Sequence, residues 1–319
     1  MRTRKLGRTG LRVSEVGFGA WAIGGTGYGP TDDRESNRAL LHAFEKGINF
    51  FDTADTYGHG HSEKLIGEIF QKSSKRSQAL IASKAGWDFY HGGDKKNFEA
   101  DYIRFACGES LRRLKTDYID LYQLHNPKLE AIQDGSVFKT LAELKKEGKI
   151  RFWGVSIHLP KEGVQTIQEG SSDTIQAVYN LIDQRIRREL IPVCEEHDIG
   201  LIAREPLYCG LLTGKYNQKS QFQKTDHRNR WDDERRAADF KKIDRLTQIL
   251  QPKQLALKQS AIEFVLRENA VSVVIPGMKT IEQVEDHLCA SNHPKVDDET
   301  FHELKQLFEQ DETFHPPPL

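Results

Sequence analysis

The sequence has few cysteines, no excess of charge of either sign and no long apolar run. Its four cysteines are far apart and form neither a CxxC pair nor a metal-finger spacing. Because disulfides are rare in the cytosol, we expect reduced thiols in a cytoplasmic protein. His59-Gly60-His61 has the look of a metal-binding pair, but no third ligand is evident nearby, so no metal site is expected.

Charge and hydropathy argue against two further classes of protein. Lys and Arg total 46 against 47 Asp and Glu, which leaves no basic surplus for a nucleic acid or an anionic membrane surface. Apolar runs such as Val271–Ile275 are far shorter than the ~20 residues that span a bilayer. We therefore expect a small-molecule partner, with no nucleic acid and no membrane. Whether the protein is a monomer or a homo-oligomer stays open.

Short apolar runs alternate with longer amphipathic stretches along the whole chain. The expected strands are Val16–Ala20, Asn49–Asp52, Ala79–Ser83, Ile119–Leu124, Phe152–Ser156, Thr174–Tyr179, Gly200–Arg204 and Val271–Pro276. Helical spacing is seen between them, for example in Arg34–Lys46, Tyr102–Leu114, Val137–Glu147 and Arg187–Glu196. Gly47, Gly148 and Gly200 follow helical stretches at the position of a C′ glycine.

Eight strand–helix units predict an α/β fold, a (β/α)8 TIM barrel that occupies residues 1–319 as a single domain. A doubly wound sheet is the main alternative. That fold usually carries a GxGxxG turn directly after its first strand. The glycines near the first expected strand, Gly17, Gly19, Gly24 and Gly25, do not have that spacing and suit a tight barrel rim better.

Three stretches break the repeat. Arg4–Leu6 and Arg12–Val16 flank a Gly-Arg-Thr-Gly turn, which predicts an N-terminal β-hairpin that could plug the bottom of the barrel. After the seventh strand, the polar segment Gly210–Phe240 shows no helical periodicity until its end, so we expect a long functional loop. The proline-rich tail Glu312–Leu319 is expected to run along the surface.

Four residues able to hold or move a proton lie at or just past the ends of expected strands: Asp52, Tyr57, Lys84 and His125. Parallel barrel strands deliver their C-terminal ends to one rim, so we expect these groups to converge there. A lysine ammonium lowers the pKa of a neighbouring phenol, and a histidine can hydrogen-bond a substrate oxygen. Such a site suits proton delivery to an oxygen that gains negative charge, as carbonyl reduction requires.

Several segments resemble the signatures of the aldo-keto reductase family, in the expected order. They are Phe51–Gly58, Thr116–His125, Gly148–Arg151 with Gly154–Ser156, Gly210–Lys215 and Ile275–Gly277. The resemblance implies NADPH-dependent reduction of aldehydes or ketones, with Tyr57 as general acid. It also implies that Lys84 tunes Tyr57, that Asp52 braces Lys84 and that His125 orients the carbonyl.

The same resemblance implies a cofactor site for NADP(H). Ser156 and Gln176 match positions that hold the nicotinamide carboxamide, although Ile157-His158 follows the serine where the family usually has Asn. Arg204 stands where many members place an aromatic ring against the nicotinamide. The remaining implied cofactor residues are Leu212, Gly214, Lys215, Gly277, Lys279, Gln283 and Asp286, and Arg228 and Arg230 are further candidates to cover the diphosphate.

Trp21 and Trp87 lie just past the first and third expected strands, so we expect both to contact the substrate, and Asn126 is a further candidate. Two alternatives remain open. Lys84 could form a Schiff base in an aldolase built on the same barrel. Some family members instead serve as cofactor-sensing subunits of membrane channels, and a protein of that kind would bind NADPH tightly but turn over slowly.

Overall fold

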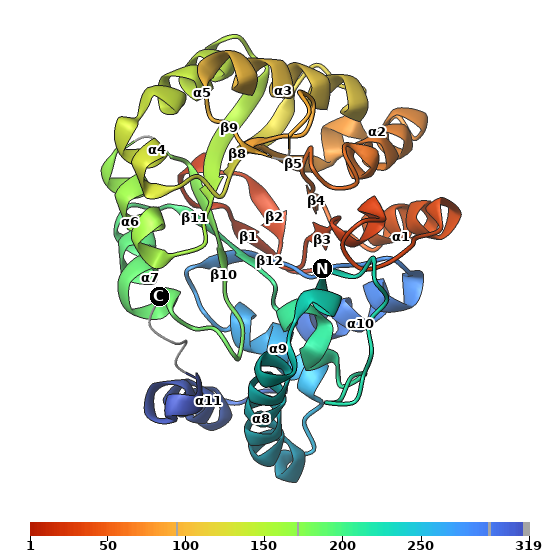
Figure 1. Ribbon diagram of the computed structural model, residues 1–319, viewed down its shortest axis with the longest axis vertical. Helices are drawn as coiled ribbons and strands as arrows, with labels where there is room; N and C mark the ends of the chain where they lie inside the picture. Colours follow the sequence, from red (N-terminus) through yellow and green to blue (C-terminus); the bar gives the residue numbers. More distant parts are fainter. Residues whose placement is uncertain (94, 171, 293–294, 315–319) are drawn as a thin grey trace.

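Eight parallel strands form one sheet that curls into a nearly closed barrel (Figure 1). The computed structural model describes residues 1–314 except 94, 171 and 293–294. In order around the barrel, the strands are β3 (Phe18–Gly19), β4 (Phe50–Asp52), β5 (Leu80–Ala85), β8 (Ile119–His125), β9 (Ile150–Ser156), β10 (Thr174–Val178), β11 (Gly200–Arg204) and β12 (Val271–Ile275). The predicted fold class and all eight predicted strands are confirmed.

The barrel is brought together where β3 meets β12. The amide of Gly17 donates to the carbonyl of Val274 at 2.8 Å, and that of Gly19 donates to Pro276 at 3.0 Å. A Cβ on Gly19 would lie 2.7 Å from the carbonyl oxygens of Ile275 and Pro276, so only glycine permits this approach. Of the four glycines predicted to make a tight rim, Gly17 and Gly19 therefore lie at the junction of β3 with β12.

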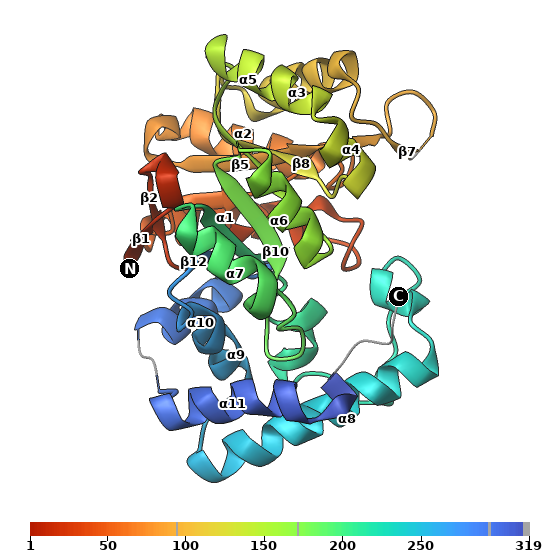
Figure 2. The same ribbon diagram turned by 90° about the vertical axis from the view of Figure 1, so that its left-hand side faces the viewer.

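Helices surround the barrel. They are α1 (Asp33–Glu45), α2 (His61–Lys72), α3 (Ala100–Leu114), α4 (Leu129–Asp134), α5 (Ser136–Lys146), α6 (Pro160–Gln168), α7 (Ile186–Glu196), α8 (Asp233–Leu250), α9 (Leu257–Leu266), α10 (Ile281–Asn292) and α11 (Asp298–Gln310). In α1, Asp32 caps the N-terminus by accepting from the Arg34 amide, while Leu40 and Ala43 face the core. Figure 2 shows α8 and α11 packed together beside the other helices.

The predicted N-terminal hairpin is confirmed and fills one end of the barrel. Strands β1 (Thr3–Lys5) and β2 (Arg12–Ser14) pair antiparallel, and the short 3-10 helix η1 (Gly7–Thr9) lies between them. Leu6 and Val13 are fully buried and pack with barrel-interior residues. Those interior residues include Phe50, Ala82, Leu121, Ile202 and Val273.

One of the three predicted helix-terminal glycines has a different role. Gly47 and Gly148 have the left-handed φ of a C′ residue, at 92° and 75°. Gly200 lies within β11 instead, and Asp198 takes the left-handed position after α7. A Cβ on Gly200 would lie 2.8 Å from Cδ1 of Leu6, so the missing side chain makes room for the hairpin.

The long connection predicted after the seventh strand is present and extends over the C-terminal rim. It contains the 3-10 helices η4 (Tyr208–Thr213) and η5 (His227–Arg230), and α8 begins at Asp233. A small antiparallel pair, β6 (Trp87–Asp88) with β7 (Lys95–Lys96), extends the rim after β5. The other short 3-10 helices are η2 (Ala22–Gly24), η3 (Arg76–Gln78), η6 (Gln251–Lys253) and η7 (Glu312–Phe314).

Two points concern the parts of the chain outside the barrel. The predicted surface course of the proline-rich tail falls on residues 315–319, which lie outside the described residues. Within the described part of the chain, none of the helices has both the length and the apolar composition to cross a membrane.

Candidate active site

Asp52, Tyr57, Lys84 and His125, here called the rim quartet, come together at the C-terminal ends of β4, β5 and β8. The Lys84 ammonium donates to Oδ1 of Asp52 at 2.6 Å, to the Thr53 carbonyl at 2.8 Å and to the Tyr57 hydroxyl at 3.2 Å. Alternation along β5 turns Lys84 into the barrel, where it is fully buried. All three hydrogen-bonding positions of the ammonium are therefore used, two of them by members of the quartet.

Burial and neighbouring charge act on Lys84 in opposite directions. Burial alone would lower the pKa of its ammonium, but Asp52 and Tyr57 beside it outweigh burial and raise that pKa. Lys84 is therefore charged at neutral pH. Asp52 receives further donors from the barrel interior, since Gln176 and Gln123 donate to its Oδ2 at 2.8 and 3.3 Å.

The phenol of Tyr57 has a raised pKa, which differs from the net lowering that the sequence suggested. Burial raises it, and the Lys84 ammonium, which acts in the expected direction, does not compensate fully. Sequence could identify the ammonium but not the depth of burial. The Tyr57 phenol is therefore protonated at neutral pH.

His125 lies at the end of β8, with its ring edge-on to that of Tyr57 at a centroid distance of 5.9 Å. Burial, followed by the positive charges of Lys84, Lys96 and Arg204, holds its pKa well below the ordinary value. The imidazole is therefore neutral at physiological pH. A neutral imidazole can donate a hydrogen bond to an oxygen without carrying charge into the site.

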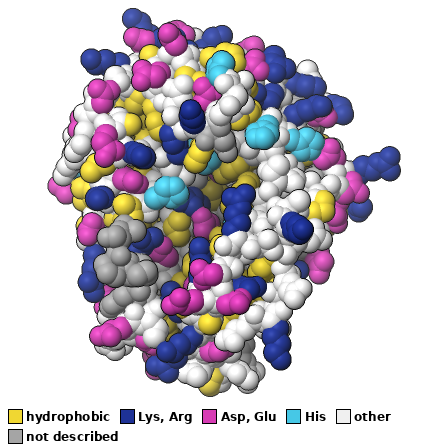
Figure 3. Space-filling model, in the orientation of Figure 1, with side chains coloured by type: hydrophobic (Ala, Val, Ile, Leu, Met, Phe, Trp, Pro, Cys, Tyr) yellow, Lys and Arg dark blue, Asp and Glu magenta, His cyan; other side chains and the backbone are white. Residues whose placement is uncertain are grey.

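Three members of the rim quartet, Asp52, Tyr57 and His125, line a cavity of about 350 Å³, here called the rim cavity. Figure 3 shows a hollow near the centre of the molecular surface, in the view of Figure 1. The predicted site residues that line the rim cavity are Trp21, Asp52, Tyr57, Trp87, His125, Asn126, Ser156, Gln176, Arg204 and Gly277. Asn126 accepts a hydrogen bond from the Ser156 hydroxyl at 3.0 Å. The predicted substrate and nicotinamide residues thus surround one space.

A second cavity of about 240 Å³, here called the loop cavity, adjoins the first under the β11–α8 connection. The two share Ala22, Tyr28, Glu205 and Gly277 in their walls. The predicted residues Lys215, Gly277, Lys279, Gln283 and Asp286 line the loop cavity. The further candidate Arg228 lines it as well. Three others do not: Leu212 packs in the core, Gly214 lies in the turn that ends η4, and Arg230 lies in η5 outside both cavity walls.

The chemistry of the two cavities fits an extended dinucleotide. Hydroxyl and amide groups of Ser156 and Gln176 lie at the rim end, whereas lysines such as Lys215 and Lys279 lie at the other end, where phosphates need cations. Three buried nitrogens of cavity-lining residues have no hydrogen-bond partner among the described residues: Nδ1 of His125, Nε of Arg204 and Nδ1 of His287. A bound polar ligand could satisfy them.

Sequence reasoning missed three residues with acidic or basic side chains that line these cavities. Lys258 reaches the loop cavity from α9 and forms an ion pair with Asp286. His287 reaches it from α10, and Glu205 stands between the two cavities. Lys258 and Glu205 lie outside the segments on which the resemblance rested, and His287 is one residue beyond Asp286. The available signal was adjacency to a predicted residue, since His287 follows Asp286 and Glu205 follows Arg204.

The arrangement defines a class of barrel oxidoreductase, and comparison with known proteins identifies the class. The model of the Aldo/keto reductase family matches residues 15–309. The chain is 34% identical to the "Uncharacterized oxidoreductase YqkF" of Bacillus subtilis, covering 98% of both chains. It is 32% identical to the "NADH-specific methylglyoxal reductase" of Escherichia coli, covering 92% of this chain and 94% of that one.

A solved structure has the same fold. The holo form of the aldo-keto reductase AKR11C1 from Bacillus halodurans superposes with a TM-score of 0.82 at 28% identity, covering 96% of each chain. The chain therefore belongs to the aldo/keto reductase family, whose members use nicotinamide cofactors.

Proposed function

We propose that the protein reduces aldehydes or ketones to alcohols, reversibly and with NADPH, and that Tyr57 is the proton donor. The observation that carries this proposal is the contact between the Lys84 ammonium and the Tyr57 hydroxyl at 3.2 Å, in a rim quartet whose Lys84 and Asp52 side chains are buried. It places a protonated phenol at the edge of the rim cavity with a compensating cation behind it.

Each member of the rim quartet has a separate role. Neutral His125 donates a hydrogen bond to the carbonyl oxygen and positions it against the Tyr57 hydroxyl. Tyr57 transfers its proton to that oxygen as negative charge develops there. Lys84 stabilises the phenolate that remains, and Asp52 fixes Lys84 in place through the 2.6 Å contact. The bound dihydronicotinamide supplies the hydride.

Residues of both cavities would bind the cofactor. Ser156, Gln176 and Arg204 would contact the nicotinamide end, with Gln176 turning from its present partner Asp52 or serving both. Lys215 and Lys279 would meet the phosphates. Lys279 is the reason to favour NADPH, because no described carboxylate forms an ion pair with its ammonium, which donates to the Tyr28 carbonyl at 2.8 Å. One relative is named NADH-specific, so the preference needs a direct measurement.

The test is consumption of NADPH and of NADH with a panel of aldehydes and ketones. Tyr57→Phe removes one hydroxyl and should lower kcat about 10²-fold or more, while NADPH binding is kept. Tyr118→Phe is the matched control, because Tyr118 precedes β8 at the far end of the barrel and lines neither cavity. Equal turnover by wild type and Tyr57→Phe would refute the assigned proton donor.

Of the two alternatives, the channel-subunit role is supported by a relative, since the chain is 28% identical to the "Probable voltage-gated potassium channel subunit beta" of Arabidopsis thaliana, covering 91% of both chains. The geometry of the site does not favour the aldolase. A Schiff-base lysine must lose its proton to act as a nucleophile, whereas Lys84 is held as an ammonium by Asp52 and Tyr57. Borohydride trapping with a carbonyl substrate would detect the adduct that an aldolase requires. A channel-subunit role predicts tight NADPH binding with very slow turnover, and the same assay separates it from an efficient reductase.

A further inference from the structure

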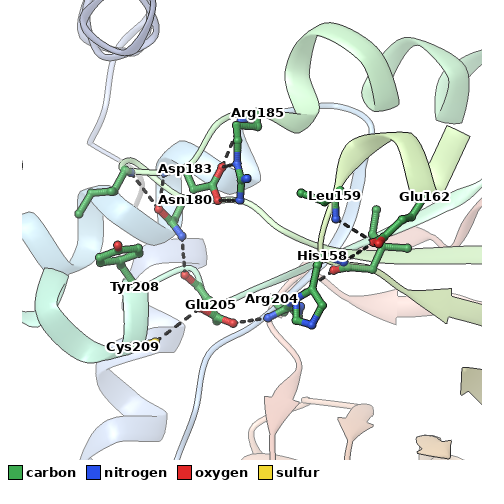
Figure 4. Close-up of polar contacts among 12 residues, drawn as sticks. His158, Leu159, Glu162, Asn180, Asp183, Arg185, Arg204, Glu205, Tyr208 and Cys209 are labelled. Carbon is green, nitrogen blue, oxygen red and sulfur yellow. Dashed lines mark hydrogen bonds and ion pairs between the residues drawn. The ribbon is translucent and has the colours of Figure 1, made fainter. Parts of the chain in front are cut away.

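Arg204 and Glu205, adjacent residues where β11 ends, form an ion pair between the two cavities. Figure 4 shows the guanidinium directed at the Glu205 carboxylate, with His158 beside it. Arg204 also donates to the Ile157 carbonyl at 3.2 Å and lines the rim cavity. Glu205 lines both cavities. The pair therefore lies at the nicotinamide end of the proposed cofactor site.

Its geometry is fixed by the surrounding chain. Glu205 has a φ of 57°, a left-handed conformation that a non-glycine residue keeps only when neighbours enforce it. Asn180 donates to the Glu205 carbonyl at 3.0 Å, and the amide of Tyr208 donates to the same oxygen at 2.9 Å. Oε2 of the side chain is contacted by the Cys209 thiol at 3.5 Å. The Glu205 carboxylate is thus held at Oε1 by Arg204 and at Oε2 by Cys209.

The charge of Arg204 is felt inside the rim cavity. After burial, Arg204 is the main influence that lowers the pKa of His158, and it also contributes to the lowered pKa of His125. A cation at this position therefore acts on groups that line the space around the reacting atoms. Glu205 supplies a charge of opposite sign next to it.

We propose that the Arg204–Glu205 pair sets the relative affinity of the site for the two redox states of the nicotinamide, an inference that rests on the proposed function. The oxidised ring carries a positive charge and the reduced ring is neutral. An uncompensated guanidinium beside the ring would disfavour the oxidised state selectively, by Coulomb repulsion in a partly buried site. Glu205 offsets that repulsion, so both states bind.

The pair would then influence the direction of the reaction. By thermodynamic linkage, the ratio of the two affinities changes the equilibrium between carbonyl and alcohol on the enzyme relative to that in solution. Weak binding of the oxidised cofactor would also speed its release. This chain has an arginine at position 204 where many family members have an aromatic ring. Because Glu205 offsets the charge of that arginine, the arginine is compatible with reversible turnover.

The test measures the dissociation constants of NADP⁺ and NADPH by quenching of tryptophan fluorescence, since Trp21 and Trp87 line the rim cavity. The quantity of interest is the Kd of NADP⁺ divided by that of NADPH. Glu205→Gln should raise this ratio about tenfold and Arg204→Gln should lower it. The double variant should return it to within about threefold of wild type, because both charges are then absent.

Asp183→Asn is the matched control. It removes a carboxylate from the neighbouring Asp183–Arg185 pair, whose closest approach is 2.6 Å and which lines neither cavity (Figure 4). Its ratio should equal that of wild type. If both cofactor forms bind but the three test variants leave the ratio unchanged, this inference is overturned and the proposed function stands. If wild type binds neither form, the proposed function itself fails.

Discussion

The ammonium of Lys84 lies 2.6 Å from Oδ1 of Asp52, and both side chains are almost completely excluded from solvent. Neither charge could be buried alone without a large desolvation penalty. The pair is stable because Asp52 also accepts from Gln176 and Gln123, and Lys84 also donates to the Thr53 carbonyl. The Lys84–Asp52 pair, which holds the ammonium beside Tyr57, is therefore also part of what stabilises the barrel interior.

Replacing Lys84 by Met should affect stability and turnover together. It leaves the Asp52 carboxylate buried without its cation, which typically costs about 3–5 kcal/mol of unfolding free energy. Urea unfolding of Lys84→Met, Asp52→Asn and the double variant checks this. The double variant should lose less than the sum of the two single losses, because no uncompensated charge remains. If the loss in the double variant equals the sum of the two single losses, Lys84 and Asp52 do not interact as a buried ion pair.

His287 should make the protein less stable as the pH falls. Burial, followed by the charge of Lys258, lowers its pKa from 6.5 to about 4. Between those values the unfolded chain binds a proton that the folded chain does not, so folding stability declines from about pH 6.5 down to about pH 4. The full shift corresponds to about 3 kcal/mol at 1.36 kcal/mol per pKa unit.

His287→Gln, which cannot titrate, isolates this contribution. Thermal unfolding is followed for both proteins between pH 7.5 and pH 4.5. Other groups with shifted pKa values contribute to both curves and cancel in the difference. The variant should show a shallower loss of stability below pH 6.5. Parallel curves would mean that His287 titrates normally in the folded state.

Lys279 should discriminate NADPH from NADH. Lys279→Met removes a half-buried ammonium from the loop cavity and should weaken NADPH binding about tenfold, while NADH binding changes less than about threefold. Lys46→Met is the control, since Lys46 pairs with Glu285 on the outer surface at 2.9 Å. Equal losses for both cofactors would place the 2′-phosphate elsewhere in the site.

Leu6 and Gly200 should be energetically coupled. Leu6→Ala empties a fully buried position at the bottom of the barrel and should cost about 3 kcal/mol. Gly200→Ala places a Cβ 2.8 Å from Cδ1 of Leu6 and should also destabilise the protein. Because truncation of Leu6 removes that clash, Gly200→Ala should cost less in the Leu6→Ala background. An unchanged cost would show that the hairpin does not occupy this position in solution.

Much of the site could be predicted because it depends on local sequence and on strand direction. Asp52, Lys84 and His125 each lie at or near the C-terminal end of an apolar β-prone run, and parallel strands bring such ends to one rim. Less could be predicted where a residue's role depends on a distant neighbour. The residues next to Gly200 in the sequence suggest a helix terminus. They do not reveal its contact with Leu6, which is far away in the sequence.

The sequence by itself determined the barrel, the hairpin that fills it and which ionisable residues meet at the rim, since these follow from periodicity, strand order and residue chemistry. Only the tertiary structure decided how those groups behave. Burial makes the net pKa shift of Tyr57 upward despite the Lys84 ammonium, and the left-handed backbone at Glu205 sets its carboxylate against Arg204. Desolvation and electrostatic pairing depend on distances between separate elements, which exist only after the chain has folded.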